Sequence, residues 1–383
     1  MAISRRTLFR HLSAGTAAAI GLPSLARAAG VEPLSSGSTD ALEGSGPVRL
    51  HRNENPFGPS PRAVAAIRDA STRVTARYPD GAAASLRKAL ASLHRVYADQ
   101  VVLGAGSDEV LSMTASAFAA GRIVIAASPT YDRVIERARG SAADVVLVPV
   151  RIGGSYDLDA MLSRANAATG LVYICNPNNP TGTVTRRSDL EAFIARLPET
   201  THVVIDEAYH HYVGGSSDYA SFLDLPLNDR RVIVTRSFST AYGLAGLRIG
   251  YAIAHPGAAA LIQSAGLTNN VSAVAAMAAM AALHDTDHVR AAIARNADNR
   301  QEFCNQANAR MLRTLDSHAN FVLLNTGHPA ADMVEHFRTH GVLVGGPFAG
   351  FDKHIRVSLG TPAEMREFWR VWDLLPPNHV MTM

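Results

Sequence analysis

Short apolar runs alternate with helical patterns from residue 82 to about residue 254 of this chain. The helical patterns cover residues 82–97 and 107–119. The apolar runs lie at residues 101–103, 123–126, 145–148, 172–174, 203–205, 232–234 and 249–253. Continuous apolar runs between helices are typical of strands that are buried on both faces. The pattern therefore predicts an α/β fold, with a large, mostly parallel sheet of about seven strands covered by helices.

The pattern changes beyond about residue 270. Two long helical patterns, at 271–284 and 287–313, precede apolar strands at 320–324 and 354–358 and then a closing helix. This order predicts a smaller α+β domain at the C-terminal end of the chain.

The region before the large domain is irregular. Residues 29–47 are rich in Gly, Ser, Pro and Ala, and an arm rich in proline and asparagine follows. Pro61 is expected to open a helix with Val64 and Ile67 facing inward. We predict four segments, namely a signal peptide (1–28), a leader and arm (29–75), a large domain (76–270) and a small domain (271–383).

The N-terminus has the features of a twin-arginine export signal. Ser4-Arg5-Arg6-Thr7-Leu8-Phe9 is followed by an apolar stretch at residues 14–22 and by Ala26-Arg27-Ala28, after which cleavage is expected. The apolar stretch is too short for an ordinary membrane span. The segment therefore predicts export to the periplasm or the exterior, the alternative being a basic N-terminus that is kept.

The signal also accounts for the positive charge of the chain. The formal charge is +3, and the segment to Ala28 holds four arginines and no acids, so the remainder has a charge of 3 − 4 = −1. That composition does not favour nucleic acid as a partner. Two cysteines cannot make a disulfide framework, and no histidine cluster with ligand spacing predicts a metal site.

Two turns have the chemistry of a phosphate site. One follows the strand at 232–234 and offers the hydroxyls of Ser237 and Ser239 and the guanidinium of Arg248. The other, Gly104-Ala105-Gly106-Ser107-Asp108, joins a strand to a helix, so Gly106, Ser107 and Asp108 can present N–H groups to an anion.

These motifs resemble those of one enzyme family. Ser237-Phe238-Ser239-Thr240-Ala241-Tyr242-Gly243-Leu244-Ala245-Gly246-Leu247-Arg248 resembles the lysine motif of pyridoxal-phosphate (PLP) aminotransferases of the class I/II, fold-type I superfamily, in the histidinol-phosphate aminotransferase branch. Here Thr240 stands at the lysine position. Further matches are residues 53–61, 176–182, 206–209 and 355–361, and the resemblance spans about 48–370.

The resemblance implies a role for each cofactor-binding residue. Tyr131 would stack on the pyridine ring, Asn179 and Tyr209 would hydrogen-bond its phenolic oxygen, and Asp206 would keep its nitrogen protonated. Gly106, Ser107, Asp108, Ser237, Ser239 and Arg248 would hold the phosphate, which Tyr78 of a partner subunit reaches in a homodimer.

The resemblance also implies where a small amino acid or amine substrate would bind. Arg356 would bind its α-carboxylate, and Asn55 belongs to the arm that borders the substrate pocket. Gly345-Gly346-Pro347-Phe348 stands where the branch usually places an arginine for the substrate phosphate. Histidinol phosphate is therefore not the expected substrate.

Thr240 leaves the catalytic chemistry open. The family lysine forms a Schiff base with PLP and then moves the proton, and a hydroxyl does neither as an amine does. Lys88 and Lys353 are the only lysines of the chain. We expect neither of them, and neither His210 nor His211, to replace it.

Three hypotheses follow. The first is a homodimeric protein that binds PLP non-covalently, as the external aldimine or as the amine form, with amino-group transfer to a 2-oxo acid as its family chemistry; Asp206, Tyr209 and the Thr240 position are its catalytic residues. The second is a lysine-free reaction such as dehydration or cyclisation. The third is a ligand-binding or partner-binding protein that does not catalyse. Thr240 is compatible with all three, and with a deliberate inactivating substitution.

Overall fold

The computed structural model describes residues 46–215, 218–224 and 228–376. The predicted signal peptide and nearly all of the leader lie outside the described residues. From Pro47 the described chain forms one unit by its internal contacts.

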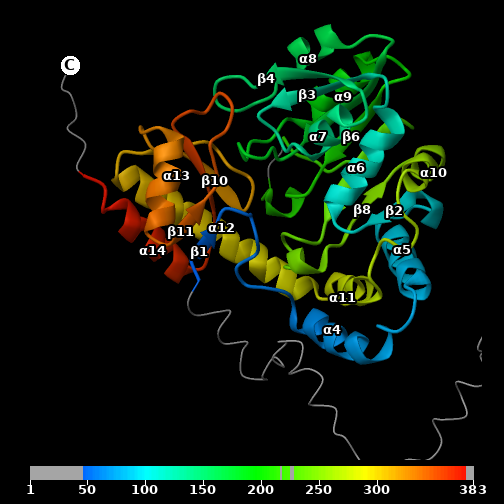
Figure 1. Cartoon of the computed structure of the whole chain (residues 1–383), viewed down its shortest axis with the longest axis horizontal. Helices are drawn as coiled ribbons and strands as arrows, with labels where there is room; N and C mark the ends of the chain where they lie inside the picture. The colour runs from blue at the N-terminus through cyan, green and yellow to red at the C-terminus, as the bar shows by residue number, and fades with distance from the viewer. Residues whose placement is uncertain (1–45, 216–217, 225–227, 377–383) are drawn as a thin grey trace, which may run out of the picture. The chain divides into compact units, whose positions relative to one another are not determined.

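A seven-stranded sheet with the order β2-β8-β7-β6-β5-β3-β4 forms the centre of this unit (Figure 1). Its strands are β2 (Val101–Gly104), β3 (Ile123–Ser128), β4 (Asp144–Pro149), β5 (Thr169–Cys175), β6 (His202–Asp206), β7 (Val232–Ser237) and β8 (Gly250–Ile253). Every predicted run lies in one of them, except that β8 begins at Gly250, one residue after the start of the run at 249–253. β8 alone runs antiparallel to its neighbours β2 and β7, so the prediction of a mostly parallel sheet is confirmed.

Helices cover both faces of this sheet. They are α4 (Pro61–Arg73), α5 (Asp80–His94), α6 (Ser107–Phe118), α7 (Arg133–Arg139), α8 (Leu158–Arg164), α9 (Arg187–Arg196), α10 (Pro256–Ser264) and α11 (Ala273–Leu283), with short 3-10 turns at η1 (Ala98–Gln100), η2 (His210–Tyr212) and η3 (Ala245–Leu247). Successive strand side chains enter different cores. Val203 and Ile205 pack with α5, α8, α9 and α11, whereas Val204 packs with α6, α7 and α10.

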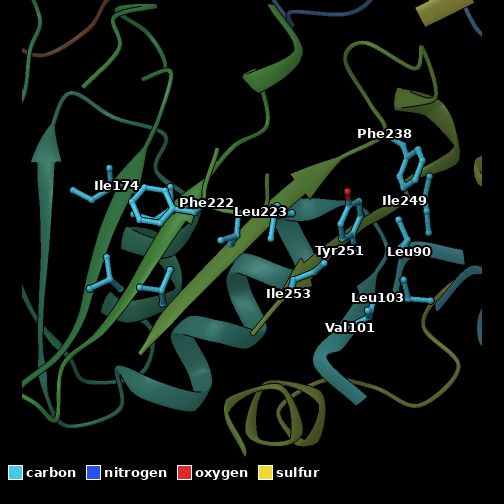
Figure 2. Close-up of a cluster of buried hydrophobic side chains, with 14 of the residues drawn as sticks. Leu90, Val101, Leu103, Ile174, Phe222, Leu223, Phe238, Ile249, Tyr251 and Ile253 are labelled. Atoms are coloured by element: carbon cyan, nitrogen blue, oxygen red, sulfur yellow. The ribbon is translucent and has the colours of Figure 1, made fainter. Parts of the chain in front are cut away.

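The first of these cores extends to the edge of the sheet beside β2. Figure 2 shows Phe238, Ile249 and Tyr251 beside Leu90 and Leu103, with Ile174 and Phe222 farther along the same cluster. The segment after β7 is thereby packed on buried apolar side chains. A loop that carries functional groups is held in this way by the core below it.

The N-terminal arm leads into α4, which packs on α11. Ser60 caps the helix by accepting from Ala63 N, and Pro61 is its first residue, as predicted. Val64 and Ile67 are only half-buried, whereas Ala63 is fully buried. The small residue faces inward because α4 and α11, an alanine-rich helix, lie close together.

A smaller group of elements follows in the C-terminal part (Figure 1). It contains α12 (Thr286–Ala309), α13 (Ala330–Thr339), α14 (Pro362–Trp372), the sheet β12-β10-β9 (His354–Ser358, Phe321–Asn325, Arg313–Thr314) and the parallel pair β1-β11 (Val48–Leu50, Val342–Val344). The arm thus enters the small sheet region through β1, and α11 shares the core of the large sheet. The predicted division at residue 270 stays a prediction.

Candidate active site

A cavity of about 620 Å³ lies at the carboxyl ends of β5, β6 and β7. Ligands of open α/β sheets bind at this edge, because the loops that follow parallel strands converge there. Most of the predicted site residues line it, namely Ser107, Asp108, Tyr131, Asn179, Asp206, Tyr209, Ser237, Ser239, Thr240, Arg248 and Arg356. The fold therefore brings together residues that are up to about 250 positions apart in the chain.

Asp206 ends β6 and is held by three donors. The Tyr173 hydroxyl donates to its Oδ2 (2.8 Å), and the Thr235 hydroxyl (3.1 Å) and the Ala208 N–H (3.2 Å) donate to its Oδ1. Burial raises the pKa of Asp206 to about 6, and its hydrogen bonds oppose that shift. A buried carboxylate of this kind is suited to pair with a protonated ring nitrogen.

The Tyr209 hydroxyl accepts hydrogen bonds from two side-chain amides. Asn53 Nδ2 lies 3.0 Å from the Tyr209 oxygen and Asn179 Nδ2 lies 3.4 Å from it. Asn53 is itself fixed by Ser358, whose hydroxyl donates to Asn53 Oδ1 (2.9 Å). Burial raises the pKa of Tyr209, so its hydroxyl remains a hydrogen-bond donor at neutral pH.

Arg248 and Asp108 meet beside the start of α6. Arg248 Nη2 lies 2.8 Å from Asp108 Oδ2, and the Tyr131 hydroxyl donates to Asp108 Oδ1 (2.5 Å). Gly106, at φ +85°, directly precedes the helix, and a Cβ there would lie 2.8 Å from Arg248 Cζ. Only glycine lets the guanidinium approach the backbone this closely. Gly106 is thus packed behind the cavity wall.

Two serines, one at the end of β7 and one just after it, add hydroxyl groups to the cavity wall that Arg248 and the start of α6 form. Ser237 ends β7, and its Oγ accepts from Ser239 N (3.0 Å). The Ser237 hydroxyl proton remains to be donated, as a phosphate oxygen requires. Hydroxyls, a helix N-terminus and a guanidinium are suited to bind a phosphate group. The residues that line this part of the cavity are therefore compatible with the phosphate of PLP.

Thr240 lies in the same cavity and is 6% exposed. Its hydroxyl donates to the Ala208 carbonyl (2.9 Å), two residues after Asp206 in the chain. Gly243, at φ +67°, lets the following turn pass the backbone of the arm, since a Cβ there would lie 2.8 Å from Pro59 N. The arm and this turn together fix the position of residue 240.

Arg356 reaches the cavity from β12. Its Nη1 donates to Asn179 Oδ1 (2.5 Å) and its Nη2 donates to the His51 carbonyl (2.6 Å). Its Nε is buried and has no acceptor among the described residues. A buried donor without an acceptor is costly, so this guanidinium is suited to bind an anionic ligand.

Besides Gly106, two predicted site residues, Asn55 and Tyr78, do not line the cavity. Asn55 does not line the cavity in the described part of the chain; its Nδ2 donates to Ala241 O (3.1 Å), and its Oδ1 accepts from Phe57 N (3.0 Å). Asn55 therefore joins the arm to the turn after Thr240. Tyr78 is 82% exposed in the turn before α5, so its contact with a partner subunit stays a prediction.

The other basic groups that we considered also lie outside the cavity lining. His210 contacts Arg236, and burial lowers the pKa of His210 and of His211. Lys88 and Lys353 are not among the lining residues either. None of these four residues is thus placed in the cavity where a family lysine would act.

Sequence reasoning missed part of the cavity lining. The additional residues are His51, Arg52, Asn53, Glu54, Arg133, Cys175, Ala208, Ala245 and Gly246. The density of prolines and asparagines around residue 53 was the available signal for the arm. Among the described residues, no group of histidine, cysteine and acidic side chains is arranged to hold a metal, and no helix has the length and apolarity of a membrane span.

Comparison with known proteins identifies the class. The family model of aminotransferase class I and II matches residues 45–371, and the chain belongs to this family of PLP-dependent enzymes.

Its relatives are histidinol-phosphate aminotransferases. The chain is 38% identical to histidinol-phosphate aminotransferase 2 of Carboxydothermus hydrogenoformans over 326 residues, covering 84% of this chain and 88% of the relative. It is 38% identical to the enzyme of Symbiobacterium thermophilum over 325 residues, with the same coverage of 84% and 88%. The structure of the Sinorhizobium meliloti enzyme in complex with pyridoxal-5′-phosphate has a TM-score of 0.79 at 29% identity, covering 93% of this chain and 96% of that one.

Proposed function

We propose that this protein binds PLP, or its amine form, without a lysine bond, and that amino-group transfer between an amino acid or amine and a 2-oxo acid is the chemistry for which its cavity is built. The observation that carries the proposal is that Thr240 lines the same cavity as Asp206, Tyr209, Ser237 and Arg248. Thr240 is taken to occupy the position of the family lysine.

Different residues of the cavity would bind different parts of PLP. Ser237, Ser239, Arg248 and the start of α6 would hold the phosphate, and Asp206 would accept from the protonated ring nitrogen. When bound, PLP supplies an electron sink for charge at the substrate α-carbon. Tyr131 is an aromatic wall of the same cavity.

The side-chain amide of Asn179 has a hydrogen-bond partner at each end. Its Oδ1 accepts from Arg356, which turns its Nδ2 toward the Tyr209 hydroxyl. Tyr209 and Asn179 can then direct N–H and O–H donors at one oxygen of a ligand. Arg356, whose Nε has no acceptor among the described residues, would bind the substrate α-carboxylate.

Thr240 sets the limit on catalysis. Its hydroxyl is already committed to the Ala208 carbonyl, and an alcohol is a far weaker base than an amine at neutral pH. Loss of a positioned proton-transfer group costs about 10²- to 10⁴-fold in rate. The same observation favours a second candidate function, namely binding of PLP-linked amino acids without turnover.

We further propose a homodimer and export by the twin-arginine route. The exposed ring of Tyr78 supports a contact with a second subunit, because a tyrosine that is 82% exposed is available to a partner. The Arg5-Arg6 signature supports export. Sedimentation of the purified protein and the N-terminal sequence of the secreted protein test these two points.

The absorbance spectrum of the protein with PLP tests the function. We expect saturable PLP binding without the band of a lysine Schiff base, and a new band when an amino acid is added. Loss of substrate amine under these conditions supports amino-group transfer, and a stable band without loss supports the second candidate. A spectrum identical to that of free PLP at every protein concentration would contradict both.

A further inference from the structure

One basic side chain lines the cavity and has no role in the proposed function. His51 directly follows β1 and is among the lining residues. Its Nδ1 is buried and has no hydrogen-bond partner among the described residues. A buried polar atom without a partner is costly, so this nitrogen is suited to interact with a ligand.

The backbone on both sides of His51 is held in place. Before it, β1 pairs with β11. After it, Asn53 N donates to the Ser358 hydroxyl (2.8 Å), and the Asn53 carbonyl accepts from Asn320 Nδ2 (2.8 Å). The backbone of His51 is therefore fixed without a ligand, as the position of a catalytic side chain requires.

His51 lies beside two groups to which the proposed function assigns the substrate and the cofactor. Its carbonyl accepts from Arg356 Nη2 (2.6 Å), and Arg356 would bind the substrate α-carboxylate. Asn53, two residues later, donates through Nδ2 to the Tyr209 hydroxyl (3.0 Å), which would face the phenolic oxygen of PLP. The α-carbon of an amino acid is bonded to its carboxylate. His51 is thus on the side of the cavity where the α-proton of a bound amino acid would be.

The surroundings of His51 keep its imidazole neutral. Burial lowers its pKa first, and the positive charges of Arg52, Arg49 and Arg356 lower it further, whereas Glu54 opposes the shift. A neutral imidazole has a lone pair on one of its ring nitrogens. His51 can therefore accept a proton at neutral pH.

Three other ionisable groups of the lining hold their own protons. Burial raises the pKa of Tyr131, of Tyr209 and of the Cys175 thiol. These groups are neutral donors at neutral pH and are not suited to remove a proton from carbon.

The three acids of the lining already have partners. Asp206 is enclosed by three neutral donors and would pair with the ring nitrogen of PLP, and Asp108 is in the ion pair described above. Glu54 Oε1 lies 2.6 Å from Arg49 Nη2. Arginines stay protonated in proteins. Of the lining residues that the structure describes, His51 is thus the base that remains.

We propose that His51 is the base that removes the α-proton of the substrate, in the role of the family lysine. The inference rests on the proposed function. The bond between the α-carbon and its hydrogen breaks, its electron pair is delocalised into the bound PLP ring, and the proton passes to Nδ1 of His51. The imidazolium then returns a proton, either to the α-carbon or to the carbon of PLP that carries the substrate nitrogen.

Proton exchange measures the first of these steps apart from amino-group transfer. PLP and L-alanine are incubated with the protein in heavy water, and NMR follows the loss of the α-proton signal of alanine, with the rate for free PLP subtracted. His51→Gln should lower the exchange rate about 10²- to 10⁴-fold, because an amide does not take up the proton. Added imidazole should restore part of the exchange to His51→Ala, since the shortened side chain leaves space for a free base.

His202→Gln is the matched control. His202 also has a buried Nδ1 with no partner among the described residues, and burial lowers its pKa to about 4. It begins β6, at the opposite end of that strand from Asp206, and does not line the cavity. This variant should exchange the α-proton at the rate of the parent protein. An equal loss in the His51 and His202 variants would overturn the assignment to His51.

A ligand that cannot react gives a second measurement, which does not depend on turnover. The reduced phosphopyridoxyl-L-alanine adduct has the α-carbon and carboxylate of the substrate. In the parent protein, it should shift one histidine Nδ1 resonance in the nitrogen NMR spectrum, because His51 is the single histidine among the lining residues that the structure describes. Pyridoxamine phosphate, which lacks the α-carbon and the carboxylate, should not shift it. Histidine resonances that do not respond to the bound adduct would contradict the proposal.

Calorimetry separates proton transfer from support of the cavity. His51→Gln should bind the adduct within about threefold of the parent protein, since the proposal gives His51 a role in removing the proton and not in affinity. Loss of adduct binding in step with loss of exchange, in both the Gln and the Ala variant, would show that His51 supports the cavity and is not the base.

The inference and the proposed function fail in different ways. If the adduct does not bind to the parent protein, the PLP cavity itself is wrongly assigned. If the adduct binds and His51→Gln exchanges the α-proton as fast as the parent protein does, the cavity stands and His51 is not the base. The same conclusion follows if the parent protein binds the adduct and does not exchange the α-proton at all.

Discussion

Two regions of the cavity differ in how completely their polar groups are satisfied: the region around Asp206 and Asp108, where we propose that PLP binds (the cofactor side), and the region around Arg356, where we propose that the substrate carboxylate binds (the substrate side). On the cofactor side, Asp206 has three donors, and Asp108 has both Arg248 and Tyr131. On the substrate side, Arg356 keeps a buried Nε with no acceptor among the described residues. The cofactor side is thus held in place by the protein alone, whereas the substrate side is suited to gain hydrogen bonds from a ligand.

This difference has an energetic consequence. A group that is oriented by protein partners binds its ligand without losing much conformational freedom. A buried donor without an acceptor lowers the stability of the ligand-free protein, and a ligand that supplies the acceptor removes this cost. Changes on the cofactor side should therefore act on PLP itself, and changes on the substrate side should act on substrate-linked ligands and leave PLP alone unaffected.

Asp206→Ala should have the largest effect on the cofactor side. Removing one partner of a buried charged pair costs about 2–5 kcal/mol, so PLP affinity should fall roughly 30-fold or more. Equilibrium dialysis with PLP measures it, with the surface variant Asp69→Ala as a control, because Asp69 is exposed on α4 in an ion pair with Arg73. Undiminished PLP affinity in the Asp206 variant would mean that the cofactor side is wrongly assigned.

Asp206 should also give the PLP-free protein a distinctive pH dependence. Burial raises its pKa from 3.8 to about 6, so the folded state holds the proton more tightly than the unfolded state does. Stability from this group is present below pH 3.8 and is lost as the pH rises through about 6. The loss amounts to ~3 kcal/mol, since each unit of pKa corresponds to about 1.4 kcal/mol.

Urea unfolding of the PLP-free protein between about pH 4 and pH 7.5 measures this change in stability. Asp206→Asn cannot titrate, so the difference in unfolding free energy between it and the parent should change by that amount across the window. A difference that is independent of pH would show that Asp206 titrates alike in the folded and unfolded states.

Arg356→Gln is expected to weaken the binding of substrate-linked ligands and to leave the binding of PLP alone unchanged. Hydrogen bonds to charged groups contribute about 1.5–3 kcal/mol, so the phosphopyridoxyl-L-alanine adduct should bind roughly 10- to 100-fold more weakly. PLP alone should bind as before. An equal loss of both ligands would show that Arg356 acts by supporting the whole cavity, through Asn179, and does not bind the carboxylate.

Gly106→Ala should have the smallest of these effects. The added Cβ would press on the Arg248 guanidinium and would stand at φ +85°, which strains the backbone before α6 by about 1–2 kcal/mol. PLP affinity should fall up to about tenfold as the phosphate donors shift. Gly121→Ala shares the backbone strain, at φ +67°, and meets no atom within 4 Å, so comparison of the two separates strain from displacement of Arg248.

The sheet could largely be predicted from apolar runs, and the exception is instructive. The run at 249–253 has the same composition as the parallel strands, yet β8 is antiparallel to β7. The segment between Ser237 and Gly250 has no helical pattern, and a parallel connection normally requires a crossover of a dozen residues or more. The direction of a strand thus depends on its connection and not on its own residues.

The site was predictable where its residues belong to a local motif. Asp206 ends a buried strand, and Tyr209 and Asn179 lie in the loops that follow buried strands, so their position at the sheet edge was expected. Asn53 and Asn55 could not be told apart in the irregular arm, because their partners, Tyr209 and Ala241, are more than 150 residues away. Which amide faces the cavity is decided by tertiary packing.

The central claim is that Thr240 occupies the position of the family lysine, and Thr240→Lys tests it most directly. Asp206, Tyr209 and Arg248 line the same cavity as Thr240. The new amine would be desolvated near cationic Arg248, which should lower its pKa toward a reactive form. Treatment with PLP and borohydride, followed by peptide mass analysis, should find reduced PLP attached to residue 240 of the variant, and none there in the parent protein. Absence of the label from residue 240 in a folded variant that still binds PLP would contradict the claim.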